Sequence, residues 1–113
     1  MDERLYSTLL YDFYGGLLTD KQKEMFESYY LNDLSLREIG EPFGITRQAV
    51  SDLLKRTKNL LAEYEARLGL VARHKALSAS VEALEERLGT LRKSHPDGNW
   101  DEVLRNIEEI KEL

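Results

Sequence analysis

The sequence predicts an all-α protein, in which a helix-turn-helix domain of about four helices is followed by a C-terminal helical hairpin. Apolar residues recur at intervals of three and four along most of the 113 residues. No segment shows the polar–apolar alternation of period two that marks a half-buried strand. Glycines, prolines and capping residues divide the periodic sequence into segments of helical length.

The first two helices are predicted within residues 3–33. Residues 3–14 carry apolar side chains on one helical face, and the glycine pair 15–16 ends this helix. Thr19 and Gln22 have the spacing of a capping box, so a second helix begins there and ends near residues 32–33. The apolar residues that define these helices are Leu5, Leu9, Leu10, Phe13, Met25, Phe26, Tyr29 and Tyr30.

A short helix and a long helix follow, and residues 35 to about 54 form the helix-turn-helix unit. Ser35 and Glu38 make a second capping box, and Gly44 breaks the helix that they begin. Thr46 is a good N-cap, and no breaker follows before Gly69, which predicts a helix to about residue 68. Its apolar stripe is Val50, Leu53, Leu54, Leu61, Tyr64 and Leu68.

The turn between these two helices needs particular residues. Gly40 supplies the small residue that two closely crossing helices require, and Gly44 tolerates a left-handed conformation. Pro42 departs from the pattern, because it removes a backbone donor, and a kink there would tilt the second helix. The missing N–H would bond near Glu38, in the first turn, so the cost is partial. The shared core is expected to contain Ile39, Phe43, Ile45, Val50 and Leu53.

The C-terminal segment predicts a hairpin. Apolar residues alternate by four and three between Leu77 and Leu91, which is a heptad seam. Residues 94–98 contain Pro96 and form a turn, and Asn99 and Glu102 match a capping pattern at the start of the last helix. We therefore divide the chain into a helix-turn-helix domain, residues 1–68, and a hairpin, residues 70–113. The seam is Leu77, Val81, Leu84, Leu88 and Leu91, and the last stripe is Trp100, Val103, Ile107 and Ile110.

The hairpin is expected to make the protein a homodimer. Two helices alone leave one side of their layer open, and two-fold pairing with a second copy would cover it. Packing of the N-terminal domain on the same side is the alternative.

Charge is distributed unevenly along the chain. The formal net charge is −5, yet residues 46–75 carry seven basic and three acidic side chains, a charge of +4. Residues 1–34 and 76–113 each carry −4. A basic centre between acidic ends favours a polyanion partner at the centre only, although amphipathic helices also acquire local charge runs by chance.

The exposed face of the long helix predicts contact with double-stranded DNA. In a helix-turn-helix this face enters the major groove, where Gln pairs with adenine and Arg with guanine. Basic residues farther along would contact phosphates, and the helix N-terminus would offer N–H groups to them. Asp52 would either accept a bond from cytosine or repel phosphate. The predicted DNA-binding residues are Thr46, Arg47, Gln48, Ser51, Asp52, Lys55, Arg56 and Lys58.

Residues 18–61, LTDKQKEMFESYYLNDLSLREIGEPFGITRQAVSDLLKRTKNLL, resemble the promoter-reading C-terminal region of bacterial sigma factors. With LYDFYGGLLT before it and the acidic tail after it, nearly the whole chain is similar to the YlxM family of small bacterial proteins. That resemblance implies a bacterial, cytoplasmic helix-turn-helix protein. It also implies a regulatory role in protein targeting, because genes of this family neighbour those of signal recognition particle components.

Other functions find little support in the sequence. There are no cysteines, which favours a cytoplasmic location, and no apolar run reaches the length of a membrane span. Motifs for phosphate loops, nucleophile elbows and zinc proteases are absent, so we expect no enzyme, no cofactor and no metal. His74 and His95 have no metal-site spacing. Five tyrosines could form a base-stacking platform, but their helical spacing favours core packing: Tyr6, Tyr11, Tyr14, Tyr29 and Tyr30.

The leading hypothesis is a regulatory DNA-binding protein. A protein-interaction adaptor of the targeting machinery, whose helix-turn-helix binds no DNA, is the first alternative, and the net acidity favours it. An RNA-binding accessory protein is the second.

Overall fold

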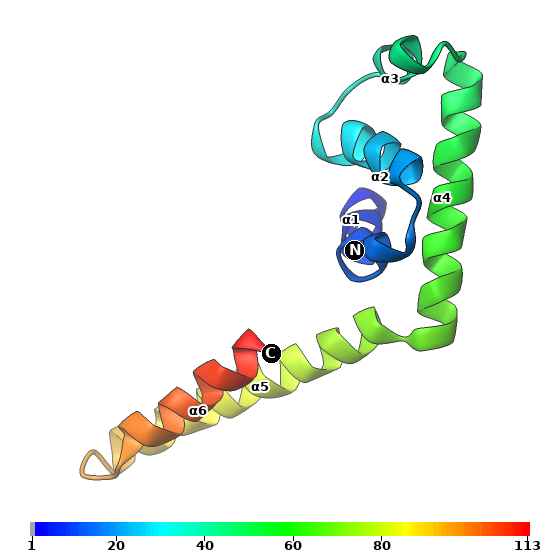
Figure 1. Ribbon diagram of the computed structural model, residues 1–113. Coiled ribbons are helices and arrows are strands. Elements are labelled where there is room, and N and C mark those ends of the chain that lie inside the picture. Colours follow the sequence, from blue (N-terminus) through cyan, green and yellow to red (C-terminus); the bar gives the residue numbers. More distant parts are fainter. Residues whose placement is uncertain (1) are drawn as a thin grey trace. The chain divides into compact units, whose positions relative to one another are not determined.

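The structure, a computed structural model, describes residues 2–113 and contains six α-helices and no strand within that range (Figure 1). The predicted all-α class is confirmed. The chain divides into two units, Met1–Val71 and Ala72–Leu113. The elements are α1 (Glu3–Tyr14), a 3-10 turn η1 (Gly15–Leu17), α2 (Asp20–Phe26), a π-helical turn η2 (Glu27–Leu31), α3 (Leu36–Phe43), α4 (Arg47–Leu68), α5 (Leu70–Ser94) and α6 (Trp100–Glu112).

Three of the predicted N-caps are present. Thr19 and Ser35 each form a complete capping box, in which the side chains of Gln22 and Glu38 accept hydrogen bonds from the backbone N–H groups of the two caps. The Thr46 side chain accepts from the Ala49 N–H, 3.1 Å away. These local bonds satisfy N–H groups that a helix start leaves without partners, which is why α2, α3 and α4 begin where the sequence predicts.

The predicted cap at Asn99 is wrong. Its side chain makes no capping bond, and instead Asn99 Nδ2 donates to Glu102 Oε2 at 3.3 Å. The backbone explains the difference: ψ is 75° at Asn99, but 161°, 159° and 161° at the three working caps. Without an extended backbone, the side chain is not aimed at the first turn of α6.

Pro42 lies inside α3, and the helix continues past it to Phe43. Gly44 then closes α3 in the left-handed conformation, with φ of 68°, and its N–H donates to the Glu41 and Gly40 carbonyls. The N–H that Pro42 lacks would have bonded the carbonyl of Glu38, in the first turn of the helix. The expected core position of Phe43 is wrong, because 36% of the residue is exposed and its ring lies 5.7 Å from the Lys21 ammonium.

An unpredicted π-helical turn ends the second helical segment. Arg4 Nη2 donates to the carbonyl oxygens of Tyr29 at 2.8 Å and Tyr30 at 3.4 Å, and it pairs with Asp33 at 3.3 Å. Carbonyls at a helix end have no intrahelical partner, and the guanidinium from α1 supplies one. Asp33 then adopts a left-handed conformation, with φ of 57°, and directs the chain toward α3.

Two apolar clusters form the core of the first unit, in which α1, α2 and α3 lie along α4 (Figure 1). One cluster joins α1 and α2 to the second half of α4, and the other joins Met25 of α2 to the helix-turn-helix. The first consists of Leu10, Tyr14, Leu18, Phe26, Leu61 and Val71, and the second of Met25, Ile39, Val50 and Leu54.

The beginning of α5 is bonded into the first unit. The Tyr14 hydroxyl donates to Glu65 Oε1 at 2.5 Å and accepts from the Leu70 N–H at 3.0 Å. Glu65 Oε1 also accepts from the Val71 N–H at 2.9 Å. Burial, and then the bond to Glu65, raise the pKa of Tyr14. Side chains from α1 and α4 therefore cap α5 directly after Gly69.

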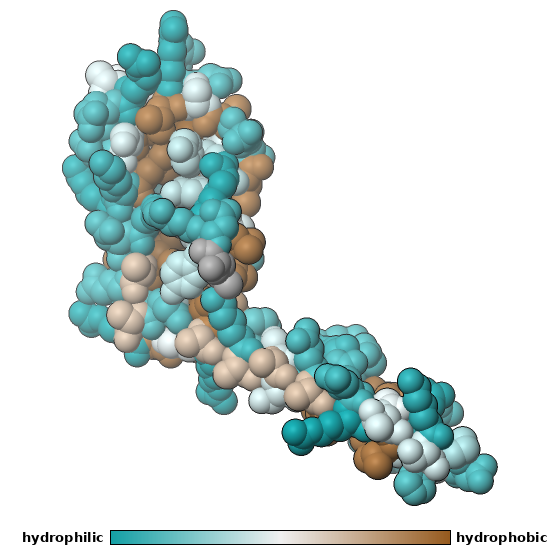
Figure 2. All heavy atoms as spheres, turned by 180° about the vertical axis from the view of Figure 1, so that it is seen from behind, coloured by the Kyte–Doolittle hydropathy of each residue, from teal (hydrophilic) through white to brown (hydrophobic). Residues whose placement is uncertain are grey.

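The second unit is an antiparallel pair formed by α5 and α6 (Figure 1). Val81 and Ile107 are buried, and Lys111 pairs with Glu85 across the two helices at 2.7 Å. Only part of the predicted heptad seam is covered, because Leu77, Leu84 and Leu91 remain 49%, 44% and 47% exposed. Figure 2 shows hydrophobic atoms reaching the surface of the hairpin in separate patches between hydrophilic side chains.

Candidate nucleic-acid interface

The crossing of α3 and α4 depends on Gly40. A Cβ at this position would lie 2.5 Å from the backbone oxygen of Ile45 and 3.2 Å from Val50 Cγ2. The Ile45 N–H donates to the Gly40 carbonyl at 3.1 Å, so the turn bonds back to the crossing point. A residue without a side chain is therefore required at the crossing that the sequence predicts. The turn holds the N-terminus of α4 against α3 with its outer face open.

All eight predicted DNA-binding residues lie within residues 46–58, at the N-cap of α4 or in the turns that follow it. Thr46, Arg47, Gln48, Lys55 and Arg56 are exposed, whereas Ser51, Asp52 and Lys58 are half-buried. Opposite them, Val50, Leu54 and Thr57 are buried.

Gln48 and Asp52 are bonded to each other along the helix. Gln48 Nε2 donates to Asp52 Oδ1 at 3.0 Å. The bond leaves the Gln48 amide with one N–H and its carbonyl oxygen, the pair of groups that adenine requires in the major groove. Asp52 thus positions the Gln48 amide, a role outside the two predicted for it, and the four-residue spacing of an amide and a carboxylate is the signal in the sequence that indicates it.

The cations of this face fall into two classes. Arg47, Lys55 and Arg56 form no ion pair with any carboxylate of residues 2–113. Lys58 Nζ, in contrast, lies 2.5 Å from Glu3 Oε1 on α1. The hydrogen bond to Glu3 is the main cause that raises the pKa of Lys58. No local signal in the sequence indicates a partner 55 residues away.

A hollow of about 200 Å³ lies beside this face, between the end of the second helical segment and α4. Its lining combines aromatic, hydroxyl and basic side chains: Tyr29, Tyr30, Leu36, Ser51, Leu54, Lys55 and Lys58. The predicted core packing of the tyrosines is confirmed: Tyr14 is buried, Tyr6, Tyr11 and Tyr30 pack against the same apolar cluster, and Tyr29 packs against the other. Tyr30 stacks on Phe26 at 4.4 Å between ring centroids, and Phe26 stacks on Tyr11 at 4.5 Å. Tyr29 and Tyr30 are only half-buried, and they reach the surface at the hollow.

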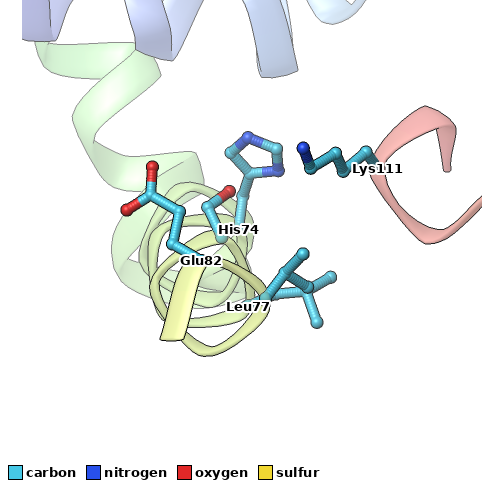
Figure 3. A pocket seen from close by; sticks show the side chains of 6 residues that line it. His74, Leu77, Glu82 and Lys111 are labelled. Atoms are coloured by element: carbon cyan, nitrogen blue, oxygen red, sulfur yellow. The ribbon is translucent and has the colours of Figure 1, made fainter. Parts of the chain in front are cut away.

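The hairpin has a separate hollow of about 250 Å³, in which His74 and Lys111 face each other from α5 and α6 (Figure 3). Lys111 pairs with Glu85 at 2.7 Å and Glu108 at 3.6 Å, and the bond to Glu85 is the main cause that raises its pKa. The ammonium is therefore already neutralised. The other lining residues are Leu77, Ser78, Val81 and Glu82.

Neither a metal centre nor a membrane span is found in the described part of the chain. Among residues 2–113, no three His, Cys, Asp or Glu side chains gather to hold a metal ion. Over the same range, no helix combines the length and the apolar character needed to cross a bilayer.

Comparison with known proteins identifies the family. Residues 1–97 match the family model UPF0122, described as "Putative helix-turn-helix protein, YlxM / p13 like". The chain belongs to the UPF0122 family. A UPF0122 protein of Thermoanaerobacter sp. (strain X514) is 49% identical over 109 residues, 96% of this chain and 91% of the relative. Another, from Caldanaerobacter subterraneus subsp. tengcongensis, is 55% identical over 85 residues, 75% of this chain and 73% of the relative. A third, from Clostridium novyi, is 37% identical over 111 residues, 98% and 94% of the two chains.

Proposed function

We propose that this UPF0122 protein is a regulatory protein that binds double-stranded DNA through the first half of α4. The observation that carries the proposal is a helix with an open outer face, fixed at its N-terminus by the Gly40 crossing. Three cations on that face, Arg47, Lys55 and Arg56, have no carboxylate partner among the described residues. A helix that binds in the major groove must be held in place by the rest of the domain, and it needs positive charge that no carboxylate neutralises.

The residues divide between reading and positioning. Arg47 and Gln48, in the first turn of α4, suit base edges, because the N-terminal residues of a recognition helix reach deepest into the major groove. Lys55 and Arg56 lie two turns farther on and suit the phosphates that flank the groove.

Binding to a random duplex at several salt concentrations tests this proposal. The paired variant Lys55→Ala/Arg56→Ala is expected to weaken binding and to flatten the log–log salt dependence by about 0.9 for each lost phosphate contact. The matched control is Arg92→Ala/Lys93→Ala, which removes the same charge from exposed neighbours at the end of α5. If folded parent protein shifts no duplex at ~50 mM salt, or if both pairs act alike, the proposal is wrong.

We further propose that a second copy of the chain covers the open side of the hairpin. Leu77, Leu84 and Leu91 are spaced by seven residues, the repeat at which helices pair. Charges on the two helices are complementary, because α5 carries five basic and three acidic side chains and α6 carries two and five. A two-fold arrangement that sets α5 of one copy against α6 of the other would match these charges and fill the hollow beside Leu77.

Light scattering on Leu84→Glu and on the parent tests the dimer. A buried glutamate in a leucine seam is costly, so the variant is expected to be a monomer at micromolar concentration with unchanged helix content. Glu86→Leu, two residues away on the same helix, is a control that keeps the seam intact. A monomeric parent would contradict the dimer. The alternative would then be that the first unit covers the exposed leucines.

A protein-interaction adaptor is the second candidate, and the exposed leucines of an acidic hairpin favour it. The role in signal recognition particle targeting that the YlxM resemblance implies would use this surface. Binding of purified targeting proteins and of structured RNA, measured with the parent and with Leu84→Glu, separates the alternatives. Loss of protein binding in Leu84→Glu, with duplex binding absent throughout, would favour the adaptor.

A further inference from the structure

We propose that the hollow between Tyr29 and Lys55 is a binding site for a DNA backbone phosphate, and that Glu3 is an internal counterion which DNA displaces from Lys58. This inference rests on the proposed DNA-binding function and extends it beyond the helix-turn-helix unit, to residues of α1 and η2.

The lining of the hollow has the chemistry of an anion site. It presents two ammonium groups, from Lys55 and Lys58, and three hydroxyls, from Tyr29, Tyr30 and Ser51, and no carboxylate is among its lining residues. The carboxylate of Glu3 lines the adjoining hollow, which shares Tyr29, Tyr30 and Lys58 with this one. Hollows elsewhere have mixed charge: Glu41 lies with Arg37 and Arg47 in one, and Glu82 with Lys111 in another. Ammonium and hydroxyl donors around an empty volume favour phosphate oxygens over any apolar ligand. The volume of about 200 Å³ is several times that of a water molecule, ~30 Å³ in the liquid.

The location of the hollow favours a phosphate of duplex DNA over a free anion. Ser51 and Lys55 are one turn apart on α4, so the hollow adjoins the face that carries Gln48. Strands that border the major groove pass on either side of a recognition helix, and contacts to their phosphates fix its register. The rim residue Tyr29 is held by Arg4, which bonds its carbonyl and lies 5.4 Å from its ring.

Glu3 forms an ion pair with Lys58, the second lysine that lines the hollow. Its carboxylate lies 2.5 Å from Lys58 Nζ, and its own side chain is 81% exposed. Solvent reaches this pair from the Glu3 side, and ion pairs open to solvent contribute little to stability, so a polyanion can replace the carboxylate. Glu3 therefore limits DNA affinity, because each binding event must first separate it from Lys58.

Replacing Glu3 tests this idea, because the substitution is expected to strengthen DNA binding. Glu3→Gln is expected to bind duplex DNA roughly two- to fivefold more tightly at ~50 mM salt, the gain from releasing one weak ion pair. The salt slope should steepen by about 0.9, because one more lysine becomes available. The matched control is Glu63→Gln, which releases Arg67 from a similar pair farther along α4 and makes the same charge change. Equal gains in both variants, or no gain in either, would overturn the proposal.

The hydroxyl of Tyr29 provides a second, independent test. Tyr29→Phe keeps the ring and is expected to lose roughly ten- to hundredfold in affinity, as for one hydrogen bond to a charged group. Tyr64→Phe is its control, because Tyr64 is also half-buried in the first unit but packs on Tyr14, away from the hollow. Circular dichroism verifies that both variants are folded.

The outcomes separate this inference from the function on which it rests. A parent protein that binds no duplex contradicts both. A parent that binds, with Glu3→Gln and Tyr29→Phe indistinguishable from their controls, contradicts the phosphate site and leaves the DNA-binding function in place.

Discussion

The helix-turn-helix and the hairpin of this protein differ in how completely their own residues cap the helix ends and bury the apolar side chains. In the first, α3 and α4 each begin with a side-chain cap, Gly44 closes α3, and Ile39 and Val50 are buried. In the second, α6 begins without a capping bond, and the leucine stripe of α5 stays open. The helix-turn-helix is thus specified by local and internal contacts, whereas the hairpin lacks a covering layer.

The largest difference in stability effect between the two regions is expected when one glycine in each is replaced by alanine. Gly40→Ala should destabilise the protein by about 1–3 kcal/mol, because its Cβ would lie 2.5 Å from a backbone oxygen that side-chain motion cannot relieve. Gly89→Ala, in α5, meets nothing within 4 Å and should stabilise by about 0.5–1 kcal/mol. Chemical denaturation measures both effects. Equal effects of the two substitutions would show that α3 and α4 do not cross at Gly40.

The capping box of α3 should give the next largest effect. Ser35→Ala removes the bond to the Glu38 N–H, 3.1 Å away, and is expected to cost about 1 kcal/mol in the free energy of unfolding at pH 7. Thr8→Ala is the control, because the Thr8 hydroxyl bonds a carbonyl inside α1 and caps no helix start. A loss for Ser35→Ala no larger than for Thr8→Ala would contradict the capping role.

The same box predicts a pH dependence. The backbone N–H of Ser35 is the main cause that lowers the pKa of Glu38 below its usual 4.5. A lowered pKa in the folded state means that the ionised carboxylate stabilises the fold above pH ~4.5, and that this contribution is lost as the pH falls through the folded pKa. Glu38→Gln should therefore show a shallower loss of stability below pH ~4.5 than the parent. Parallel acid profiles would contradict this assignment.

Dilution tests whether the hairpin depends on a second copy. If α5 and α6 open only after a dimer dissociates, tenfold dilution raises their open fraction about threefold, or ~0.7 kcal/mol, by mass action. Amide hydrogen exchange should then quicken in α6 with dilution, while exchange in α3 stays constant. Exchange rates in α6 that are independent of concentration would show that the hairpin closes within one chain.

The sequence predicts those features of the fold that depend on neighbours along the chain. Thr19, Ser35 and Thr46 cap helices, and Gly40 and Gly44 occupy the positions that the turn requires. These choices are predictable because backbone geometry within a few residues determines them.

Features that join distant segments were not predictable. The local pattern predicts a phosphate contact for Lys58 but not its Glu3 partner, and it contains no signal for the bonds that Tyr14 makes to Glu65 and Leu70. The heptad pattern indicates the seam of α5, but it does not show that Val81 is buried while Leu77 stays exposed. Which side of a periodic helix is covered depends on the placement of another element, and periodicity alone does not contain that information.

The smallest predicted effect concerns Asn99, whose residue type matches a cap but whose backbone does not. Its ψ of 75° directs the side chain to Glu102 instead of the first N–H groups of α6. Asn99→Ala should therefore change stability by less than about 0.5 kcal/mol, as for a surface substitution, in contrast to the loss expected for Ser35→Ala. Thermal denaturation of the two variants, at one protein concentration, makes the comparison. A loss near 1 kcal/mol for Asn99→Ala would mean that α6 is capped in solution, and the contrast between a locally completed helix-turn-helix and an incomplete hairpin would then rest on the open leucines alone.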